Sequence, residues 1–386
     1  MTWPTKKLGE VCDFIFGYSF KAEDFNETGR GLPVIRIGDI DKGFTEKFYD
    51  KEYDKRYLVD NGDILIGLSG SIKIDKWQGE RALLNQRIVK ICNFKKDVLG
   101  DFVFYQLPKV LKRLEIQIAQ GTVKNVLLPH LSNLKILTPR LKIQYQIVER
   151  LDAIKKAQEL NDKQIELAEE LFQSLLHHEL DPKGKDWPTK KIGELLVKFD
   201  RGISWSRNDE MIINKGIPVL RIPNVLEGEI ILNNIKRINI LDNIVNENLL
   251  KYGDIVMVAS NGNPDLVGRS ALVGKKERGM LFASFLARLR FAQTKILPQY
   301  AFWFLFLPYS KKEIRRKIAT TSGIYNLKKE HIEKIQIPLP PIETQRKIVE
   351  KLSIVQEYKK KLLEQKQKLQ ELFESVLNKS MRGELI

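Results

Sequence analysis

The sequence predicts two α/β (α+β) modules and two long helices, arranged as a tandem repeat with pseudo-twofold symmetry. Three observations lead to this prediction. Short motifs return in the same order, β-branched runs lie between turn residues in each copy, and apolar residues recur at heptad spacing after each module. We expect the modules at residues 1–141 and 186–341, and the helices at residues 142–185 and 342–386.

The tandem repeat is carried by short anchor motifs. The segments between the anchors share little, which indicates one duplicated frame with divergent insertions, although loops also drift without any functional reason. The anchors are WPTKKLGE (3–10) with WPTKKIGE (187–194), PVIRI (33–37) with PVLRI (218–222), GDI (62–64) with GDI (253–255), and IVERL (147–151) with IVEKL (348–352).

Each module has the pattern of a small mixed sheet with helices. An aromatic stretch precedes Pro108 in the first copy and Pro308 in the second, and a basic helix is expected after each. Runs rich in β-branched residues and bounded by Gly, Asn and Asp predict strands. These runs are residues 32–37, 63–68 and 88–92 in the first copy, and 217–222, 254–259 and 286–291 in the second.

The two long helices have the pattern of a coiled-coil seam. Two amphipathic helices that pack separately on their modules are the alternative, but the 3.5-residue period in both copies argues against it. Connectivity favours an antiparallel pair, which brings the C-terminus back beside the N-terminus and holds the modules about 45 Å apart. The predicted seam residues are Ile147, Leu151, Ile154, Phe172 and Leu175, then Ile348, Leu352, Val355, Leu369 and Phe373.

Composition indicates a polyanionic partner. The net charge is +16, and almost all of the excess lies in the two modules, although solvated lysine faces also occur without such a partner. The two cysteines, Cys12 and Cys92, form no CxxC pattern and predict neither a disulfide nor a metal site. With no signal-like or membrane-spanning run, we expect a cytoplasmic protein.

Several of these motifs occur together in one known family. The anchors, the strands PVIRIGDI and PVLRIPNV, and the run PLPPIETQRKIVEKL before a helix ending LFESVLNKSMRGEL resemble specificity subunits of Type I restriction-modification enzymes. The resemblance spans the whole chain. It implies target-recognition domains at 1–141 and 186–341, and conserved coiled-coil helices at 142–185 and 342–386. One departure, Thr138-Pro139-Arg140, stands where the second copy has Leu339-Pro340-Pro341.

The resemblance also implies a function and partners. Each domain would read one half of a bipartite, gapped target in double-stranded DNA, while the helices fix the gap and dock two methyltransferase (modification) subunits. Restriction (nuclease or translocase) subunits are further partners in some of these enzymes. The methyltransferase would carry S-adenosylmethionine, and no cofactor is expected in this chain.

Catalytic motifs are not found in the sequence. Asn263-Pro264-Asp265-Leu266 resembles the start of an adenine-methyltransferase motif but lacks its second proline and its aromatic residue. None of the four histidines belongs to a metal-binding motif in the sequence. His130 and His331 occupy equivalent positions in the two copies, which indicates a structural role in the repeated frame. We therefore expect a non-catalytic subunit. The alternatives are one chain with its own methyltransferase or nuclease activity, and a coiled-coil nucleic-acid-binding scaffold outside restriction-modification.

Candidate DNA contacts divide into phosphate-binding cations and base-reading polar groups. A solvated basic face and ordinary turn formers are the alternatives. Arg36 and Arg221 recur in the frame, so each is either a structural ion pair or a base contact. The cations are Lys112, Lys312, Arg315 and Arg316. The loop and strand-end candidates are Ser69, Lys73, Gln86, Arg87, Lys124 and Asn125 in the first domain, and Ser260, Asn261, Asn263, Arg288, Tyr325 and Asn326 in the second.

Overall fold

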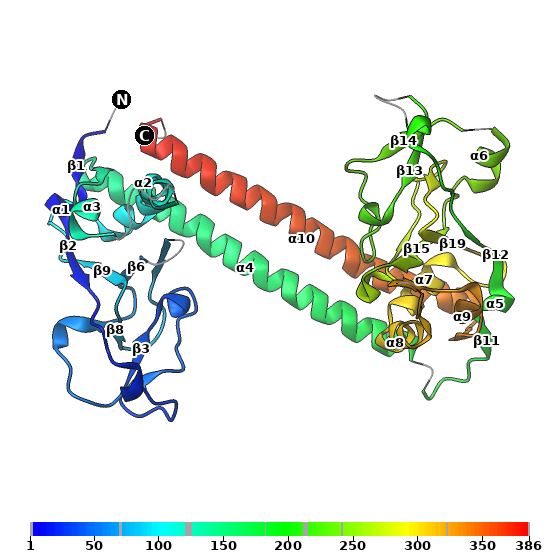
Figure 1. The fold of residues 1–386 in the computed structure, drawn as a ribbon, viewed down its shortest axis with the longest axis horizontal. Coiled ribbons are helices and arrows are strands. Elements are labelled where there is room, and N and C mark those ends of the chain that lie inside the picture. Colours follow the sequence, from blue (N-terminus) through cyan, green and yellow to red (C-terminus); the bar gives the residue numbers. More distant parts are fainter. Residues whose placement is uncertain are drawn as a thin grey trace. The chain divides into compact units, whose positions relative to one another are not determined.

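A computed structural model describes residues 3–68, 72–119, 126–181, 183–210, 215–240, 242–321 and 323–384. The chain divides into two compact units. Unit 1 comprises Met1–Asp162 with Glu364–Ile386, and unit 2 comprises Lys163–Leu363. Each unit therefore holds one α/β domain, one half of helix α4 (Leu141–Leu180) and one half of helix α10 (Ile342–Arg382) (Figure 1).

Among its described residues, the domain of unit 1 contains two four-stranded sheets and a two-stranded ribbon. The antiparallel sheet has the order β2 (Asp13–Phe16), β9 (Ile88–Cys92), β6 (Ile64–Gly67), β7 (Lys73–Lys76). The mixed sheet has the order β4 (Phe48–Tyr49), β3 (Leu32–Ile35), β8 (Ala82–Leu84), β5 (Leu58–Val59). β1 (Thr5–Lys7) pairs with β10 (Lys135–Leu137), and the helices are α1 (Leu8–Val11), α2 (Gly100–Ala119) and α3 (Leu128–Ser132).

The domain of unit 2 repeats this plan. Its antiparallel sheet is β12 (Leu196–Arg201), β19 (Leu286–Phe291), β15 (Ile255–Val258), β17 (Ser270–Leu272), and its mixed sheet is β14 (Lys236–Ile238), β13 (Ile217–Leu220), β18 (Leu281–Phe282). The ribbon is β11 (Thr189–Lys191) with β22 (Gln336–Pro338). Helices are α5 (Ile192–Leu195), α6 (Asp242–Asn248), α7 (Pro298–Phe306), α8 (Pro308–Lys317) and α9 (Lys329–Glu333). A further sheet has the order β16 (Ser260–Asn261), β21 (Ile324–Asn326), β20 (Ala319–Thr321). The predicted tandem repeat of mixed modules is confirmed.

The repeated PVIRI and PVLRI anchors end in the same capped turn. In unit 1 the buried Asp39 carboxylate accepts from the Arg36 backbone N–H at 3.1 Å and pairs with the Arg36 Nε at 3.2 Å. In unit 2 the buried Asn224 side chain accepts from the Arg221 N–H at 3.0 Å. Both strands therefore stop before this arginine, because its N–H is used by the turn. For Arg36, the structure favours the ion pair over a base contact.

The repeated GDI motif holds the turn that starts the central strand. Gly62 and Gly253 have φ of 90° and 85°, a conformation that side chains other than glycine disfavour. The following Asp63 accepts from the Asp60 N–H at 2.8 Å and pairs with Lys90 at 3.3 Å. Asp254 makes the equivalent contacts, with the Lys251 N–H and with Arg290. The motif is therefore a structural part of the repeat.

His130 and His331 also belong to the frame. The His130 Nδ1 accepts from the Leu127 N–H at 2.9 Å at the start of α3, and the His331 Nδ1 accepts from the Lys328 N–H at 3.5 Å at the start of α9. Both histidines satisfy a backbone donor that has no partner within its helix. The predicted frame role is confirmed by these contacts.

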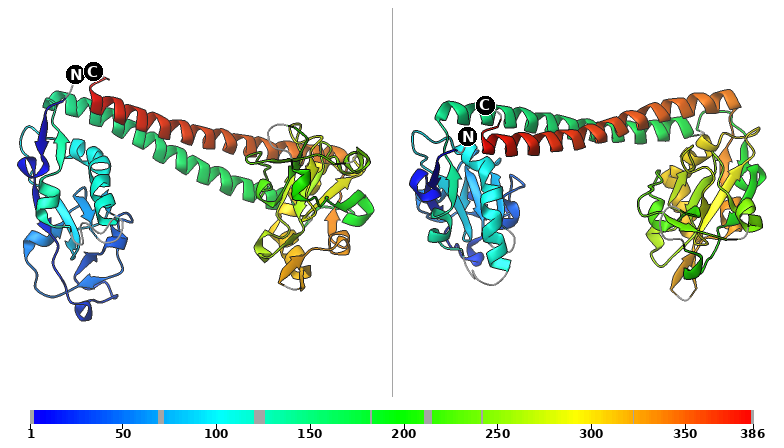
Figure 2. Two further views of the ribbon diagram at one scale, coloured as in Figure 1. Left: turned by 45° about the horizontal axis from the view of Figure 1, so that its top comes forward. Right: turned by 90° about the horizontal axis from the view of Figure 1, so that it is seen from above.

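The two long helices pack antiparallel within each unit (Figures 1 and 2). In unit 2, Lys359 pairs with Glu169 at 2.5 Å and Lys351 with Glu179 at 2.7 Å, so later residues of α4 meet earlier residues of α10. In unit 1, Lys366 pairs with Asp162 at 2.8 Å. The buried apolar residues of the pair are Phe172, Leu176, Leu180, Ile348, Leu352 and Val355 in unit 2, and Ile147, Val148 and Leu151 in unit 1, where the partly buried Phe373, Val376 and Leu377 pack against them.

Most predicted seam residues are buried in the apolar cores of the pair, and the others are partly buried. Ile154, Leu175, Leu369 and Phe373 are only partly buried, and Leu176 and Leu180 lie deeper than Leu175. The helices start at equivalent positions, because Gln144 and Gln345 are fully buried and bind the Leu99 and Leu297 N–H groups at 2.8 and 2.9 Å. The Thr-Pro-Arg departure therefore leaves the start of α4 unchanged.

Residues near both chain ends meet in unit 1. The Trp3 indole N–H donates to the Ser380 carbonyl at 2.8 Å, which confirms the expected return of the chain. Within the described ranges, no helix has the length and apolar character needed to cross a membrane.

Candidate nucleic-acid interface

In unit 2, several predicted contact residues gather where β15 ends and β19 begins. The Ala259 and Ser260 N–H groups both donate to the Phe285 carbonyl, at 2.9 and 3.1 Å. Beyond this point Ser260 pairs with Asn326, and Asn261 pairs with Tyr325, in the sheet of β16 and β21. We name residues 259–261, 284–285 and 324–327 the unit 2 edge. Four of the predicted residues, far apart in sequence, thus share one edge.

Asn263 and Arg315 extend this edge toward helix α8. The Asn261 side chain accepts from the Asn263 N–H at 2.8 Å, and the Asn263 side chain accepts from the Asp265 N–H at 2.9 Å. Asp265 pairs with Arg315 at 2.5 Å, and both side chains are mostly exposed. The ion pair joins the basic helix to the loop that carries the polar candidates.

The other predicted cations of unit 2 lie on the same helix. Arg316 pairs with Glu313 at 3.2 Å. Lys312 is exposed, and within the described ranges it has no ion-pair partner closer than 4.0 Å. Lys312 is therefore available for a phosphate group.

Two predicted base contacts prove to be interior residues. Arg288 is 0% exposed: its guanidinium binds the Asp200 carboxylate at 2.9 and 2.5 Å and the carbonyls of Leu249 and Glu247. The prediction for Arg288 is wrong, because its strand position directs the side chain into the domain. Ser260 is 6% exposed, and its hydroxyl accepts from Arg201 and donates to Asn326, so it positions neighbours and is not free to read a base.

Unit 1 builds the same strand junction with different side chains. The Leu68 N–H donates to the Arg87 carbonyl at 2.8 Å, so the end of β6 meets the turn before β9. At this turn, Gln86 accepts from the Ser19 hydroxyl at 3.1 Å. Lys73, at the start of β7, pairs with Asp41 at 3.0 Å, and Lys112 is exposed on α2. Ser69, Lys124 and Asn125 lie outside the described residues.

The structure adds residues at these junctions that the sequence analysis missed. Gly17 and Gly202 occupy equivalent positions, where an added Cβ would lie 1.9 Å from the Asn85 carbonyl oxygen and 2.0 Å from the Phe282 carbonyl oxygen. Only glycine fits this crossing. The sequence did hold a signal for this crossing, because a glycine follows the first long strand in both copies.

Exposed aromatic residues flank both junctions. Tyr18 follows Gly17 and is 50% exposed, and Phe285 is 49% exposed in the turn before β19. A hollow of about 350 Å³ beside Phe285 is lined partly by Trp205, Arg221 and Ser284. Aromatic faces and guanidinium groups suit contact with nucleic-acid bases.

Arg201 is a charged residue that contacts the unit 2 edge. It ends β12, and its guanidinium donates to Ser260, Ala259, Ser284 and Leu327. Burial lowers the pKa of this guanidinium below its usual value. No signal in the sequence singled it out, because Phe16 occupies the equivalent position in the first copy.

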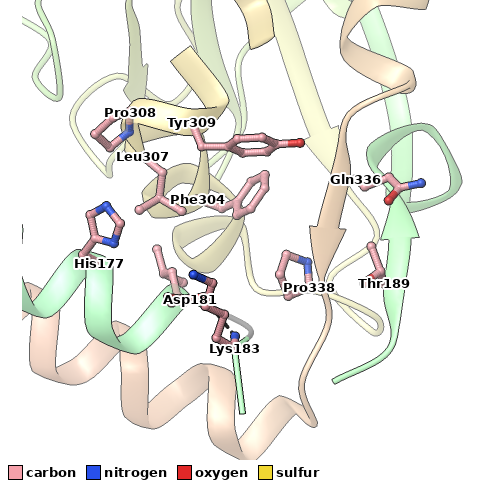
Figure 3. A pocket seen from close by; sticks show the side chains of 11 residues that line it. His177, Asp181, Lys183, Thr189, Phe304, Leu307, Pro308, Tyr309, Gln336 and Pro338 are labelled. Carbon is pink, nitrogen blue, oxygen red and sulfur yellow. Dashed lines mark hydrogen bonds between the residues drawn. The ribbon is translucent and has the colours of Figure 1, made fainter. Parts of the chain in front are cut away.

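A different pocket of unit 2 lies where the end of α4 meets the α7–α8 junction and β22 (Figure 3). Its volume is about 430 Å³, and its walls are mainly apolar, including Leu180, Phe304 and Pro338. His177, Asp181 and Lys183 contribute polar groups around it. Over the described part of the chain, no group of three or more His, Cys, Asp or Glu residues is placed to hold a metal ion.

The comparisons with known proteins agree with the architecture. The family model described as "Type I restriction modification DNA specificity domain" matches residues 1–170 and 184–372. The chain is 25% identical to the Type I restriction enzyme EcoBI specificity subunit of Escherichia coli, over 100% of this chain and 86% of that protein. It is 24% identical to the MjaVIII specificity subunit of Methanocaldococcus jannaschii, over 99% and 93% of the two chains.

Solved structures show the same fold. The S subunit of a Type I restriction-modification system from M. genitalium superposes with a TM-score of 0.65 at 13% identity, covering 98% of this chain and 96% of that one. A chain from a structure of the assembly and conformational transition of a type I R-M system superposes with a TM-score of 0.56 at 17% identity, covering 100% of this chain and 98% of that one. With two copies of the family's domain covering most of its length, this chain belongs to the Type I restriction-modification DNA specificity family, whose members recognise DNA and are not themselves catalytic.

Proposed function

We propose that this chain reads a bipartite, gapped target in double-stranded DNA, one half with each domain. The observation that carries this proposal is the duplicated edge: the same strand junction is built twice, with Ser19, Gln86 and Arg87 in unit 1 and with Asn261, Phe285 and Tyr325 in unit 2. One frame with two sets of side chains suits two different half-sites. Base edges are read by such polar and planar groups, whereas phosphates are held by cations.

The phosphate contacts are assigned to the basic helices beside these edges. Lys312 and Arg315 are exposed on α8, and Arg315 is tied to the loop of Asn263 through Asp265. Lys112 is exposed on α2, the corresponding helix of unit 1. Cations at these positions would fix the register of each domain on the duplex, and the polar edge would supply discrimination.

The long helices are proposed to fix the gap and to dock two methyltransferase subunits, which carry S-adenosylmethionine. Leucines outside the seam are about half exposed in both units: Leu167, Leu171 and Leu363 in unit 2, and Leu160 and Leu372 in unit 1. Exposed apolar residues repeated along a helix pair are typical of a surface that packs against further helices. Restriction subunits would join the same complex where the system includes them.

The test is sequencing of methylated DNA from the source strain, with and without this gene and with the neighbouring genes intact. We expect N6-methyladenine to disappear from one gapped, asymmetric motif when the gene is deleted. An unchanged methylome, with the methyltransferase demonstrably expressed, would contradict the proposal and favour a scaffold that prefers no bipartite duplex.

A further inference from the structure

Arg201 connects all the segments of the unit 2 edge. Its Nη1 donates to the Ser260 hydroxyl at 2.9 Å and to the Ser284 carbonyl at 3.5 Å, and its Nη2 donates to the Ala259 and Leu327 carbonyls at 3.2 Å each. These partners lie 58 to 126 residues away in sequence. A single side chain thus ties together the end of β15, the turn before β19 and the end of β21.

The network continues to the polar groups of the edge. The Ser260 hydroxyl, which accepts from Arg201, donates to the Asn326 side chain at 2.5 Å. Asn261 follows Ser260 directly and pairs with Tyr325. Asn261, Phe285 and Tyr325 are each adjacent in the chain to a residue of this network. Their positions therefore depend on hydrogen bonds that begin at Arg201.

The chemistry of these contacts requires a guanidinium. All four acceptors are neutral oxygens, and within the described ranges no carboxylate lies within 4.0 Å of Arg201. A partly buried cation without an acidic partner is costly, and among the described residues no ion pair offsets that cost for Arg201. The planar fork of arginine serves several oxygens in fixed directions, which a lysine ammonium on a flexible stem does not.

The contrast with unit 1 makes the role specific to one domain. The equivalent position there is Phe16, which is 36% exposed and offers no side-chain hydrogen bond. We infer that Arg201 is a positioning residue that holds the reading segments of unit 2 in one arrangement, so that recognition of one half of the DNA target depends on it. This inference rests on the proposed function.

The experiment compares Arg201→Met, Arg201→Lys and Ser260→Ala with the unaltered chain, each in complex with the modification subunits. Arg278→Met is the matched control, because Arg278 is exposed in the loop between β17 and β18. The neighbouring Gly279 N–H donates to the Leu250 carbonyl, so this loop lies near the start of β15, whereas the edge follows the end of β15. Two readouts are used: the methylated motif in cells, and binding of duplexes altered in one half or the other, over a range of salt concentrations.

We expect Arg201→Met to lower the preference for the correct second half by about tenfold, because the reading side chains must then be ordered on binding. Methylation should spread to sites altered in that half only. Arg201→Lys should not restore the preference, and the salt dependence should stay unchanged. Ser260→Ala should lower the preference for the same half of the target to a smaller extent. Combining Ser260→Ala with Arg201→Met should lower it little further than Arg201→Met alone.

Two results would overturn the inference. One is an unchanged motif and an unchanged preference in Arg201→Met, whatever the effect of Ser260→Ala. The other is restored binding in Arg201→Lys with a salt slope lowered by about one in Arg201→Met, which would make Arg201 a phosphate contact. Retained discrimination at the first half shows that unit 1 is folded and that the complex is assembled, and an unchanged salt slope shows that the basic helix α8 of unit 2 still contacts DNA. If the unaltered complex itself preferred no gapped motif, the proposed function would fail instead.

Discussion

Replacing Asn161 with leucine is expected to stabilise unit 1. Asn161 lies in α4 at only 2% exposure, and neither its side-chain oxygen nor its nitrogen has a hydrogen-bond partner among the described residues. A buried polar group without a partner costs about 1–3 kcal/mol. Leucine removes this cost and also favours the helix by about 0.5 kcal/mol. The expected gain in the free energy of unfolding is therefore about 1.5–3.5 kcal/mol.

Urea denaturation followed by circular dichroism measures this gain. A chain of two units need not unfold in one step, so the midpoint of the helix-reporting transition is compared between variants. Gln164→Leu is the control, because Gln164 is exposed on the same helix and its replacement changes helix propensity only slightly. A midpoint for Asn161→Leu no higher than that of the control would refute the reasoning, and would mean that the amide is satisfied or that the leucine does not fit.

Three further predictions concern the DNA contacts, the strand crossing and the response to pH. Lys312→Ala should weaken binding to all DNA sequences alike and lower the slope of log affinity against log salt by about one; an unchanged slope in a binding titration would contradict the phosphate assignment. Gly202→Ala should lower the melting temperature measured by circular dichroism, since the new Cβ would lie 2.0 Å from the Phe282 carbonyl oxygen, and an unaltered melting temperature would show that the crossing can open. Burial raises the pKa of both Tyr105 and Tyr300, and the contact with Asp152 adds to the effect at Tyr105. The unfolded state then loses protons above about pH 10 while the folded state keeps them, so stability should fall as pH rises past that value; Tyr105→Phe should reduce the fall in urea titrations, and an identical pH profile would count against the assignment.

The sequence alone was sufficient for the repeat, the mixed modules and the long antiparallel helices. Local physics is enough here: GDI needs a glycine at positive φ and a carboxylate that holds the turn, and both copies retain them. Heptad spacing likewise marks the buried stripe, and Ile147, Leu151, Ile348 and Leu352 all lie in it. The small errors in the seam, such as Leu175, arise because a helix pair that also packs on a domain buries more than one stripe.

The recognition edge was only partly accessible from the sequence. Polar residues at strand ends pointed to Asn261, Tyr325 and Asn326, which the tertiary structure brings to one place. Composition could not separate them from Arg288, because an arginine in a strand faces solvent or interior according to which elements cover the sheet. The tertiary structure alone decided that Arg288 is an interior residue bound to Asp200 and that Arg201 joins three distant segments. The physical reason is that local motifs depend on neighbours in sequence, whereas the roles of these two arginines depend on acceptors that become neighbours only when the chain folds.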